Sequence, residues 1–370
     1  MSRRTGEMPW WADALILTVL NLALAFLVSG AVIYAIGESP IECAQIMFTG
    51  AFGSGQGIGY TLFYATNFIF TGLAFALAFH AGLFNIGVEG QANIAGLGVA
   101  LASLYFENLP QPLVILLAIV FTALFGAAWA FIPAILQAKR GSHLVITTIM
   151  FNFIASSVMV YLLGNFLKPA DSMNPATRIF VPTARLPLLQ DIAHGIGIPF
   201  AESPLNLAFV WALICAAGVW VLVWRSRLGY ELRTLGASRP AAIYAGMPVT
   251  RLTVIALMLS GGLGGFLALN EVMGSQNKLF LDFTGGYGFV GIAVALMGRS
   301  RSFGIVLAAI LFGALYQGGG ELALAKSTIS RDIVILVQGL VILTVGALEN
   351  MLRPSLARVF AGRPPLGQEA

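Results

Sequence analysis

The sequence has little charge. Only 10% of its 370 residues are charged, while 58% are hydrophobic, and the mean hydropathy is +0.87. Soluble domains carry about 25% charged residues, so this composition excludes an ordinary soluble protein. Apolar runs of about 17 to 25 residues, long enough to cross the hydrocarbon core of a bilayer, recur along almost the whole chain. The sequence therefore predicts a single all-α membrane domain over residues 1–370.

Cysteine and histidine are also scarce. The two cysteines, Cys43 and Cys215, form no CxxC pair and no Cys/His cluster, which argues against a metal site and a disulfide framework. The three histidines lie in separate regions and suggest no nucleophile, base and orienting group acting together. The GxxxxGK[ST] pattern of a phosphate-binding P-loop is absent. We therefore expect no catalytic residue, no metal and no cofactor in this chain.

The apolar runs predict about ten transmembrane helices, with boundaries defined to within several residues. The first run is longer than the apolar part of a signal peptide and lacks a clear cleavage site, so we interpret it as a retained helix. The predicted spans are 12–36, 60–80, 87–106, 112–138, 143–166, 205–224, 252–271, 285–298, 303–319 and 332–350.

Lysine and arginine are distributed unevenly between the loops. Most of the 20 basic residues fall in the tails 1–11 and 351–370, in the loop 225–251 and in two short turns on the same side. The positive-inside rule places these segments and both termini in the cytoplasm. The loop 167–204 then faces outward, and its several prolines predict an ordered, non-helical cap. No basic run alternates with aromatic residues, which argues against a nucleic-acid partner.

One polar stretch, HAGLFNIGVEGQANIAG at residues 80–96, interrupts the apolar pattern. No Lys or Arg occurs between Arg4 and Lys139, which is unusual if this stretch is a cytoplasmic turn. We expect an interrupted helix region at membrane depth, where irregular backbone is tolerated against protein or a water-filled cavity. Asn85 is a suitable N-cap for a helix that restarts at Ile86. Interrupted helices often build the substrate region of a transporter.

Glu89 is the most informative residue of this stretch, because a carboxylate at the bilayer centre costs about 2.5 to 3.5 kcal/mol. Two interpretations remain open. Glu89 complements the dipole of the restarted helix and ties two helices together, or it contacts the solute. Interhelical hydrogen bonds explain amide side chains as well as a binding site does. The candidate substrate-pathway residues are Asn85, Glu89, Gln91 and Asn93.

The loop 225–251 contains a second informative pattern. A short helix is predicted from Pro240 to Ala245, with proline in its first turn and Gly246 directly after its end. Its exposed apolar side chains are expected to pack against another surface. This surface is either a protein partner or the membrane, where arginines attract anionic lipid. The amphipathic helix before it carries Leu228, Leu232 and Leu235 on one stripe.

Three motifs resemble the permease subunits of ABC importers for nucleosides and simple sugars, a group that also includes ribose and branched-chain amino acid permeases. The resemblance covers about residues 60–350, and the first motif with the long outer loop is most similar to the larger of the two permeases in nucleoside systems. The motifs are FNIGVEGQ at 84–91, AAIYAG at 241–246 and YGFVGIAVALMG at 287–298.

The resemblance implies an importer in the bacterial inner membrane. This chain would form half of the translocation path, beside a second permease in a heterodimer. A cytoplasmic subunit would bind ATP and Mg, and an external binding protein or lipoprotein would deliver the solute. The Ser238-Arg239-Pro240 sequence departs from the Asn-Pro pair of many relatives, which affects the details of ATPase pairing. The coupling helix that docks into the ATPase would comprise Pro240, Ala241, Ala242, Ile243, Tyr244, Ala245 and Gly246.

A different class of transporter is the alternative. A secondary transporter driven by protons or sodium would use Glu89 and Glu271 to couple charge movement to transport. An ATPase that co-purifies with the chain would support the importer, whereas transport by the chain alone under an ion gradient would support the alternative. A membrane-embedded enzyme is disfavoured because the sequence offers no catalytic cluster.

Overall fold

The computed structural model describes residues 17–195, 197, 201–330, 332–341 and 343–344. The predicted tails 1–11 and 351–370 lie outside these residues. Within them the chain forms helices and no strand, and β pairing is limited to isolated bridges between Ala176 and Phe280 and between Leu188 and Asn206. The predicted all-α class is confirmed.

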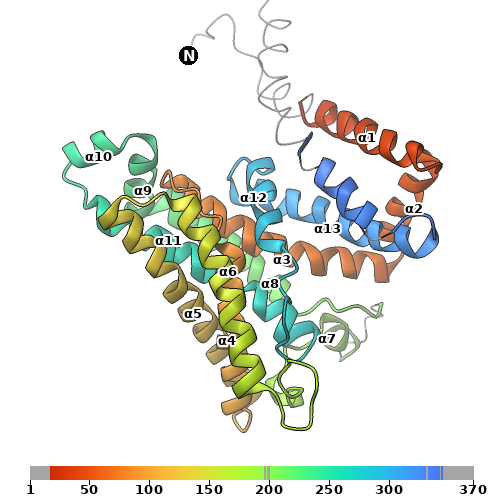
Figure 1. Cartoon of the computed structure of the whole chain (residues 1–370), viewed down its shortest axis with the longest axis horizontal. Helices are drawn as coiled ribbons and strands as arrows, with labels where there is room; N and C mark the ends of the chain where they lie inside the picture. Colours follow the sequence, from red (N-terminus) through yellow and green to blue (C-terminus); the bar gives the residue numbers. More distant parts are fainter. Residues whose placement is uncertain (1–16, 196, 198–200, 331, 342, 345–370) are drawn as a thin grey trace, which may run out of the picture. The chain divides into compact units, whose positions relative to one another are not determined.

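The helices carry the labels of Figure 1. They are α1 (Leu17–Ala35), α2 (Pro40–Phe52), α3 (Gly55–His80), α4 (Val88–Tyr105), α5 (Gln111–Arg140), α6 (Leu144–Leu162), α7 (Leu189–Gly195), α8 (Ala208–Arg225), α9 (Arg227–Ala237), α10 (Arg239–Tyr244), α11 (Val249–Gly265), α12 (Tyr287–Met297) and α13 (Ser302–Ala325). Two π-helical segments, Leu163–Leu167 and Leu269–Ser275, a 3₁₀ turn, Pro182–Ala184, and a further apolar helix, Asp332–Val341, also lie within the described residues.

Six of the described helical segments are long and apolar enough to cross a membrane. The helices α1 and α2 form a seventh candidate span that is bent by 116°. The prediction of about ten spans is therefore not confirmed. Helices α4 and α12 lie where spans were predicted, but the polar residues of α4 lower its hydropathy, and α12 has only 11 residues, against the roughly 20 that a span needs. The six segments are Gly55–His80, Gln111–Arg140, Leu144–Leu167, Ala208–Arg225, Val249–Ser275 and Ser302–Ala325.

The described residues form two compact units, one over residues 51–317 and a smaller one that combines described residues before 51 with described residues after 317. In the smaller unit the Lys326 ammonium lies 3.2 Å from the Glu38 carboxylate and 2.9 Å from that of Glu42. A hydrophobic cluster forms its described core, with Ile33, Cys43, Leu322, Ile329, Val334 and Val337 buried together.

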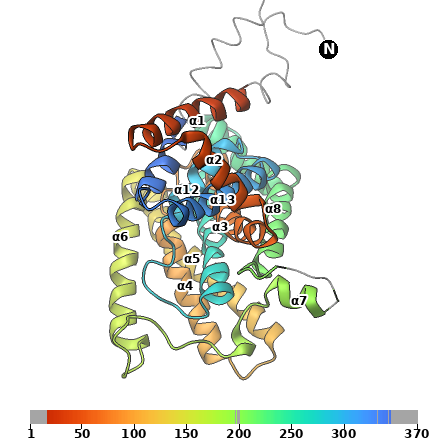
Figure 2. The same ribbon diagram turned by 90° about the vertical axis from the view of Figure 1, so that its right-hand side faces the viewer.

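Helices α3 and α11 form the centre of the larger unit. Buried residues make up 83% of the apolar stretch in α3 and 72% in the segment that contains α11, against 28% in α5. Helix α11 packs along α5 and α3, α4 packs on α5, and α12 packs on α3 (Figures 1 and 2). A Cβ atom on Gly261 of α11 would lie 2.5 Å from the carbonyl oxygen of Gly126 on α5. These glycines therefore serve close helix packing.

The loop 167–204 packs on the second π segment and on the residues that follow it. The backbone N–H groups of Thr177 and Leu186 donate to the carbonyls of Leu279 and Met273, at 2.9 and 3.1 Å. In the described part of this loop, the expectation that it contains no helix is wrong, because α7 and a 3₁₀ turn lie within it. Prolines surround α7 without interrupting its seven residues, and Asp191 in its first turn favours the helix.

Candidate functional site

The segment between α3 and α4 is irregular, with Asn85 and Gly87 buried in the larger unit while Gly82 and Phe84 are exposed. Helix α4 begins at Val88 and not at Ile86, and Asn85 is not its N-cap. The side-chain oxygen of Asn85 instead accepts a hydrogen bond from the Gly87 N–H, at 2.9 Å. An asparagine that binds the backbone two residues further on stabilises a turn, which explains why the helix starts later than predicted.

The predicted residues Asn85 and Gln91 contact each other and bond across helices. The Asn85 amide nitrogen donates to the Ser260 hydroxyl of α11 at 2.9 Å and to the Gln91 side-chain oxygen at 3.1 Å. The Ser260 hydroxyl in turn donates to the Ala74 carbonyl of α3, at 2.6 Å. Asn85 and Gln91 are both buried. Their hydrogen-bonding groups thus join α3, α4 and α11 around the irregular segment.

Asn152 of α6 is a further polar residue here that sequence reasoning missed. Its side-chain oxygen accepts from the Gly90 N–H at 2.9 Å, and its nitrogen donates to the Ile86 carbonyl at 3.1 Å. The predicted residue Asn93 also faces α6, where its nitrogen lies 3.4 Å from the Ser156 hydroxyl. A lone asparagine in the apolar run of α6 is the signal that could have indicated Asn152.

Glu89 lies in the first turn of α4, half-buried, and binds the beginning of α12. Its two carboxylate oxygens accept hydrogen bonds from the backbone N–H groups of Gly286, at 2.9 Å, and Gly288, at 2.7 Å. Gly286 is the N-cap of α12, with a φ of +80°. Because the first N–H groups of a helix lack partners within it, a carboxylate there is favourable. The interpretation that Glu89 ties two helices together gains geometric support.

A second buried polar cluster joins α3 to the π segment 269–275. The Asn67 amide nitrogen donates to the Glu271 carboxylate at 2.6 Å, and its side-chain oxygen accepts from Asn270 at 2.8 Å. Asn206, before α8, donates to the Asn270 side-chain oxygen at 3.0 Å. Interruptions of this kind often mark functional sites. Sequence reasoning named Glu271 alone, because the other three are separated from each other along the chain.

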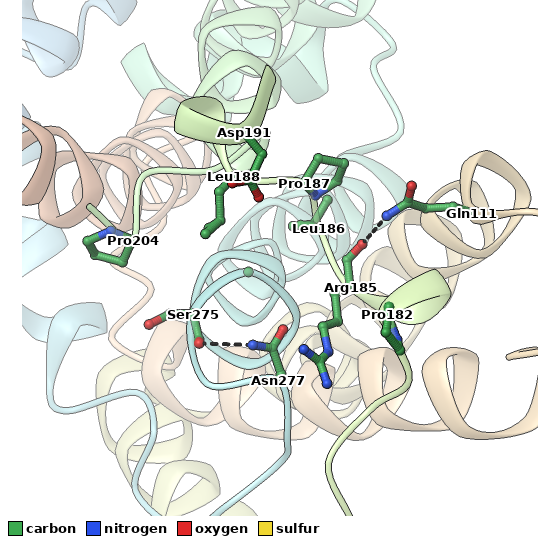
Figure 3. Close-up of a pocket in the computed structure, with 11 residues that line it drawn as sticks. Gln111, Pro182, Arg185, Leu186, Pro187, Leu188, Asp191, Pro204, Ser275 and Asn277 are labelled. Atoms are coloured by element: carbon green, nitrogen blue, oxygen red, sulfur yellow. Dashed lines mark hydrogen bonds between the residues drawn. The ribbon is translucent and has the colours of Figure 1, made fainter. Parts of the chain in front are cut away.

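A pocket of about 460 Å³ lies between the loop 167–204 and the end of the π segment (Figure 3). The Arg185 guanidinium is held by a hydrogen bond from its Nε to the Phe180 carbonyl, at 2.8 Å. The Gln111 side chain donates to the Arg185 carbonyl at 3.0 Å. The wall consists of Gln111, Pro182, Arg185, Leu186, Pro187, Leu188, Asp191, Pro204, Gly274, Ser275 and Asn277.

The predicted short helix of the loop 225–251 is present as α10. The Ser238 hydroxyl accepts from the Ala241 N–H at 3.4 Å, and Gly246, with a φ of +71°, follows the end of the helix. Ala242 is fully buried, whereas Ile243 is 58% exposed and Tyr244 96% exposed. The other predicted residues of this helix, Pro240, Ala241, Ala245 and Gly246, are exposed.

Helix α9 fixes α10 to the rest of the unit. Its predicted leucine stripe is confirmed, since Leu232 and Leu235 are buried and Leu228 packs beside them. Their cluster contains Ala242 of α10 and residues of α3 and α11, such as Ala78 and Leu252. An open groove of about 890 Å³ lies beside α10; its wall includes Ile135, Arg239, Ile243, Met247, Arg251, Val254 and Ile255.

In the part of the chain that the structure describes, no three His, Cys, Asp or Glu side chains are placed to hold a metal ion. The buried amides described above donate hydrogen bonds to neighbouring helices. Their arrangement is that of helices joined through buried amides, with one short apolar helix projecting at an end.

Comparison with known proteins identifies similar chains. A family model described as the branched-chain amino acid transport system / permease component matches residues 57–346. The guanosine ABC transporter permease protein NupP of Bacillus subtilis is 35% identical over 90% of this chain and 91% of its own. The glucose ABC transporter permease protein TsgB13 of Haloferax volcanii is 33% identical, over 88% and 85%. The nucleoside ABC transporter permease protein NupB of Lactococcus lactis is 30% identical, over 81% and 82%.

Proposed function

We infer the function of this chain from its family: it belongs to the branched-chain amino acid transport system / permease component family, and is a membrane-spanning permease of an ABC importer. Members of this family work with a separate ATPase subunit and a substrate-binding protein. The similarity extends over nine-tenths of the chain, at 90% coverage for the guanosine permease. An ion-gradient-driven secondary transporter is not favoured by these relationships.

We propose that the solute is a nucleoside. Two of the three relatives above are named for guanosine or nucleoside, and the third for glucose. A neutral solute with a flat base and a hydroxylated ring suits amide side chains and aromatic rings. The test is ATP-dependent uptake of radiolabelled guanosine by the complete importer in proteoliposomes, with glucose as competitor. Uptake blocked by excess guanosine supports the proposal, and uptake of glucose alone contradicts it.

We propose that α10 is the coupling helix and that the residues from Pro240 to Gly246 form it. The observation that carries this proposal is the opposite placement of two neighbouring side chains, Ala242 buried and Tyr244 96% exposed. Because Ala242 packs in a hydrophobic cluster with residues of α9 and α11, α10 cannot move independently of these helices. A displacement of Tyr244 by a bound partner would therefore move α9 and α11 as well. An exposed aromatic side chain on a rigid support is a favourable anchor for a protein partner.

The membrane orientation follows from the same assignment. We propose that α10, the loop 225–251 and both termini face the cytoplasm of a bacterial cell, in agreement with the concentration of basic residues there. A second permease would complete the translocation path as a heterodimer, and the arginines beside α10 would also contact anionic lipid. Labelling of an Ile243→Cys variant from the cytoplasmic side only would support this orientation, and labelling from outside would overturn it.

We propose that Asn85, Glu89, Gln91 and Asn93 shape the substrate pathway by fixing its helices. Asn85 and Gln91 bond to each other and to α11, Asn93 faces α6, and Glu89 binds the beginning of α12. A buried amide whose groups are already bonded gains little from a solute, because it would exchange one hydrogen bond for another. The pathway itself would then be lined by the neighbouring surfaces of these helices.

A further inference from the structure

We propose that the pocket of Figure 3 is a binding site for the hydroxylated ring of the solute, a pentose in the case of a nucleoside. This inference rests on the importer function and adds a site of contact within the permease. It assigns Asp191 to the ring hydroxyls and Arg185, Gln111, Ser275 and Asn277 to the surrounding polar groups.

The pocket and α10 lie at opposite ends of one candidate span. The segment Val249–Ser275 has 27 residues, which at about 1.5 Å per residue exceed the roughly 30 Å of the hydrocarbon core. Helix α10 ends just before Val249, whereas Gly274 and Ser275 line the pocket at the other end. With α10 in the cytoplasm, the pocket opens toward the side from which an importer receives its solute.

The pocket presents opposite charges that do not neutralise each other. Among the described residues no ion pair joins Arg185 to Asp191, although both line the pocket. The bond from Arg185 Nε to the Phe180 carbonyl fixes the guanidinium plane and leaves its terminal nitrogens to donate to a ligand. A carboxylate such as that of Asp191 accepts hydrogen bonds from ring hydroxyls, as acidic residues do with ribose in nucleotide sites.

The remaining wall fits a neutral polar ring. The Gln111 and Asn277 amides and the Ser275 hydroxyl supply further donors and acceptors. The volume of about 460 Å³ falls within the range of roughly 300 to 1,000 Å³ for small-molecule sites. One positive and one negative group together favour a solute without net charge over an anion or a cation.

The pocket is connected to the buried amides of the larger unit. Gly274 lies in the pocket wall, and a Cβ atom on Gly274 would lie 2.3 Å from the Asn206 amide nitrogen. Asn206 bonds to Asn270, which bonds to Asn67, the partner of Glu271. A ligand that contacts Ser275 therefore sits one turn from the polar residues inside the bundle.

Equilibrium binding to the purified importer, without its external binding protein, tests the site. The probe is radiolabelled guanosine, with ribose and 2′,3′-dideoxyguanosine as competitors. We expect ribose to displace the radiolabelled guanosine. The dideoxy compound should displace it at least tenfold more weakly than unlabelled guanosine does, because it lacks the 2′ and 3′ hydroxyls of the ring. The proposal would be overturned if the dideoxy compound competed as strongly as unlabelled guanosine, or if guanosine did not bind at millimolar concentration.

A pair of variants distinguishes the loss of a contact in the pocket from a general effect of removing an aspartate from the loop. Asp191→Ala should weaken guanosine binding at least tenfold, whereas Asp171→Ala, an exposed aspartate of the same loop outside the pocket, should leave it unchanged. Binding that is unaffected by Asp191→Ala in a normally assembled complex contradicts the site. The proposed function is judged separately, by ATP-dependent guanosine uptake in the unmodified importer with its binding protein.

Discussion

The Glu89 carboxylate of α4 accepts a hydrogen bond from the Gly288 backbone N–H of α12 at 2.7 Å, across 199 positions of sequence. The same carboxylate also accepts from the Gly286 N–H. One acidic side chain thus lies at the beginnings of two helices, its own and the one it binds. The arrangement fixes the relative position of two short, glycine-rich helix starts within the larger unit.

Substitution of Glu89 should affect stability in a graded way. Glu89→Ala removes both acceptors and leaves two backbone N–H groups without them, at about 1 to 3 kcal/mol each. Glu89→Gln keeps one acceptor oxygen, so we expect a smaller loss. The measurement is the thermal unfolding midpoint of the purified importer, together with the uptake rate. Equal losses in both variants would instead indicate that the negative charge itself is required.

Gly288 has no room for a side chain. A Cβ atom there would lie 2.5 Å from the Glu89 backbone nitrogen, so Gly288→Ala should destabilise the importer by about 1 to 3 kcal/mol through overpacking. The matched control is Gly218→Ala on α8, where a Cβ atom would meet no atom within 4 Å. This control should be neutral or slightly stabilising, because alanine is the better helix former. Similar losses of stability in both variants would show that the close approach of Gly288 to the Glu89 backbone is not what makes glycine necessary at position 288.

Alanine substitutions of Asn85 and Asn93 should cost different amounts of stability, although both residues are buried amides of the same polar stretch. Asn85 binds Gly87, Gln91 and Ser260, so Asn85→Ala should cost about 1 to 3 kcal/mol. Asn93 has one long bond, 3.4 Å to Ser156, and Asn93→Ala should cost about 0.6 kcal/mol. Thermal unfolding of the two variants checks the order. A larger effect on uptake than on stability at Asn93 would indicate solute contact there.

The sequence predicted where helices lie better than how they meet. Hydropathy located α3, α5, α6, α8 and α11, and the proline and glycine positions predicted α10 to within one residue at each end. The partners of Glu89 could not be predicted, because Gly286 and Gly288 become its neighbours only through tertiary packing. The bend between α1 and α2 was missed for a related reason: glycine and proline near residues 37–40 permit a turn but do not set its angle.

Variants of the buried residue Glu271 distinguish a structural role of its side chain from a role in ion coupling. Its carboxylate accepts a hydrogen bond from Asn67 at 2.6 Å, and a glutamine oxygen can accept the same bond. Glu271→Gln should therefore retain ATP-dependent uptake, whereas Glu271→Leu should lose stability by about 1 to 3 kcal/mol, because the buried Asn67 amide nitrogen loses its acceptor. Complete loss of uptake in a stable Glu271→Gln variant would support a role for the ionisable group.

The coupling role of α10 is the central claim, and Tyr244→Asp tests it most directly. A charge at an aromatic anchor should cost about 2 kcal/mol or more, roughly 30-fold in affinity. The matched control is Tyr105→Asp at the end of α4, where the tyrosine is 74% exposed but lies on the predicted outer side. The measurement is the affinity of the purified ATPase subunit for the membrane-inserted permease. We predict that Tyr244→Asp abolishes or strongly weakens binding while Tyr105→Asp leaves it unchanged; normal ATPase binding by Tyr244→Asp would contradict the account.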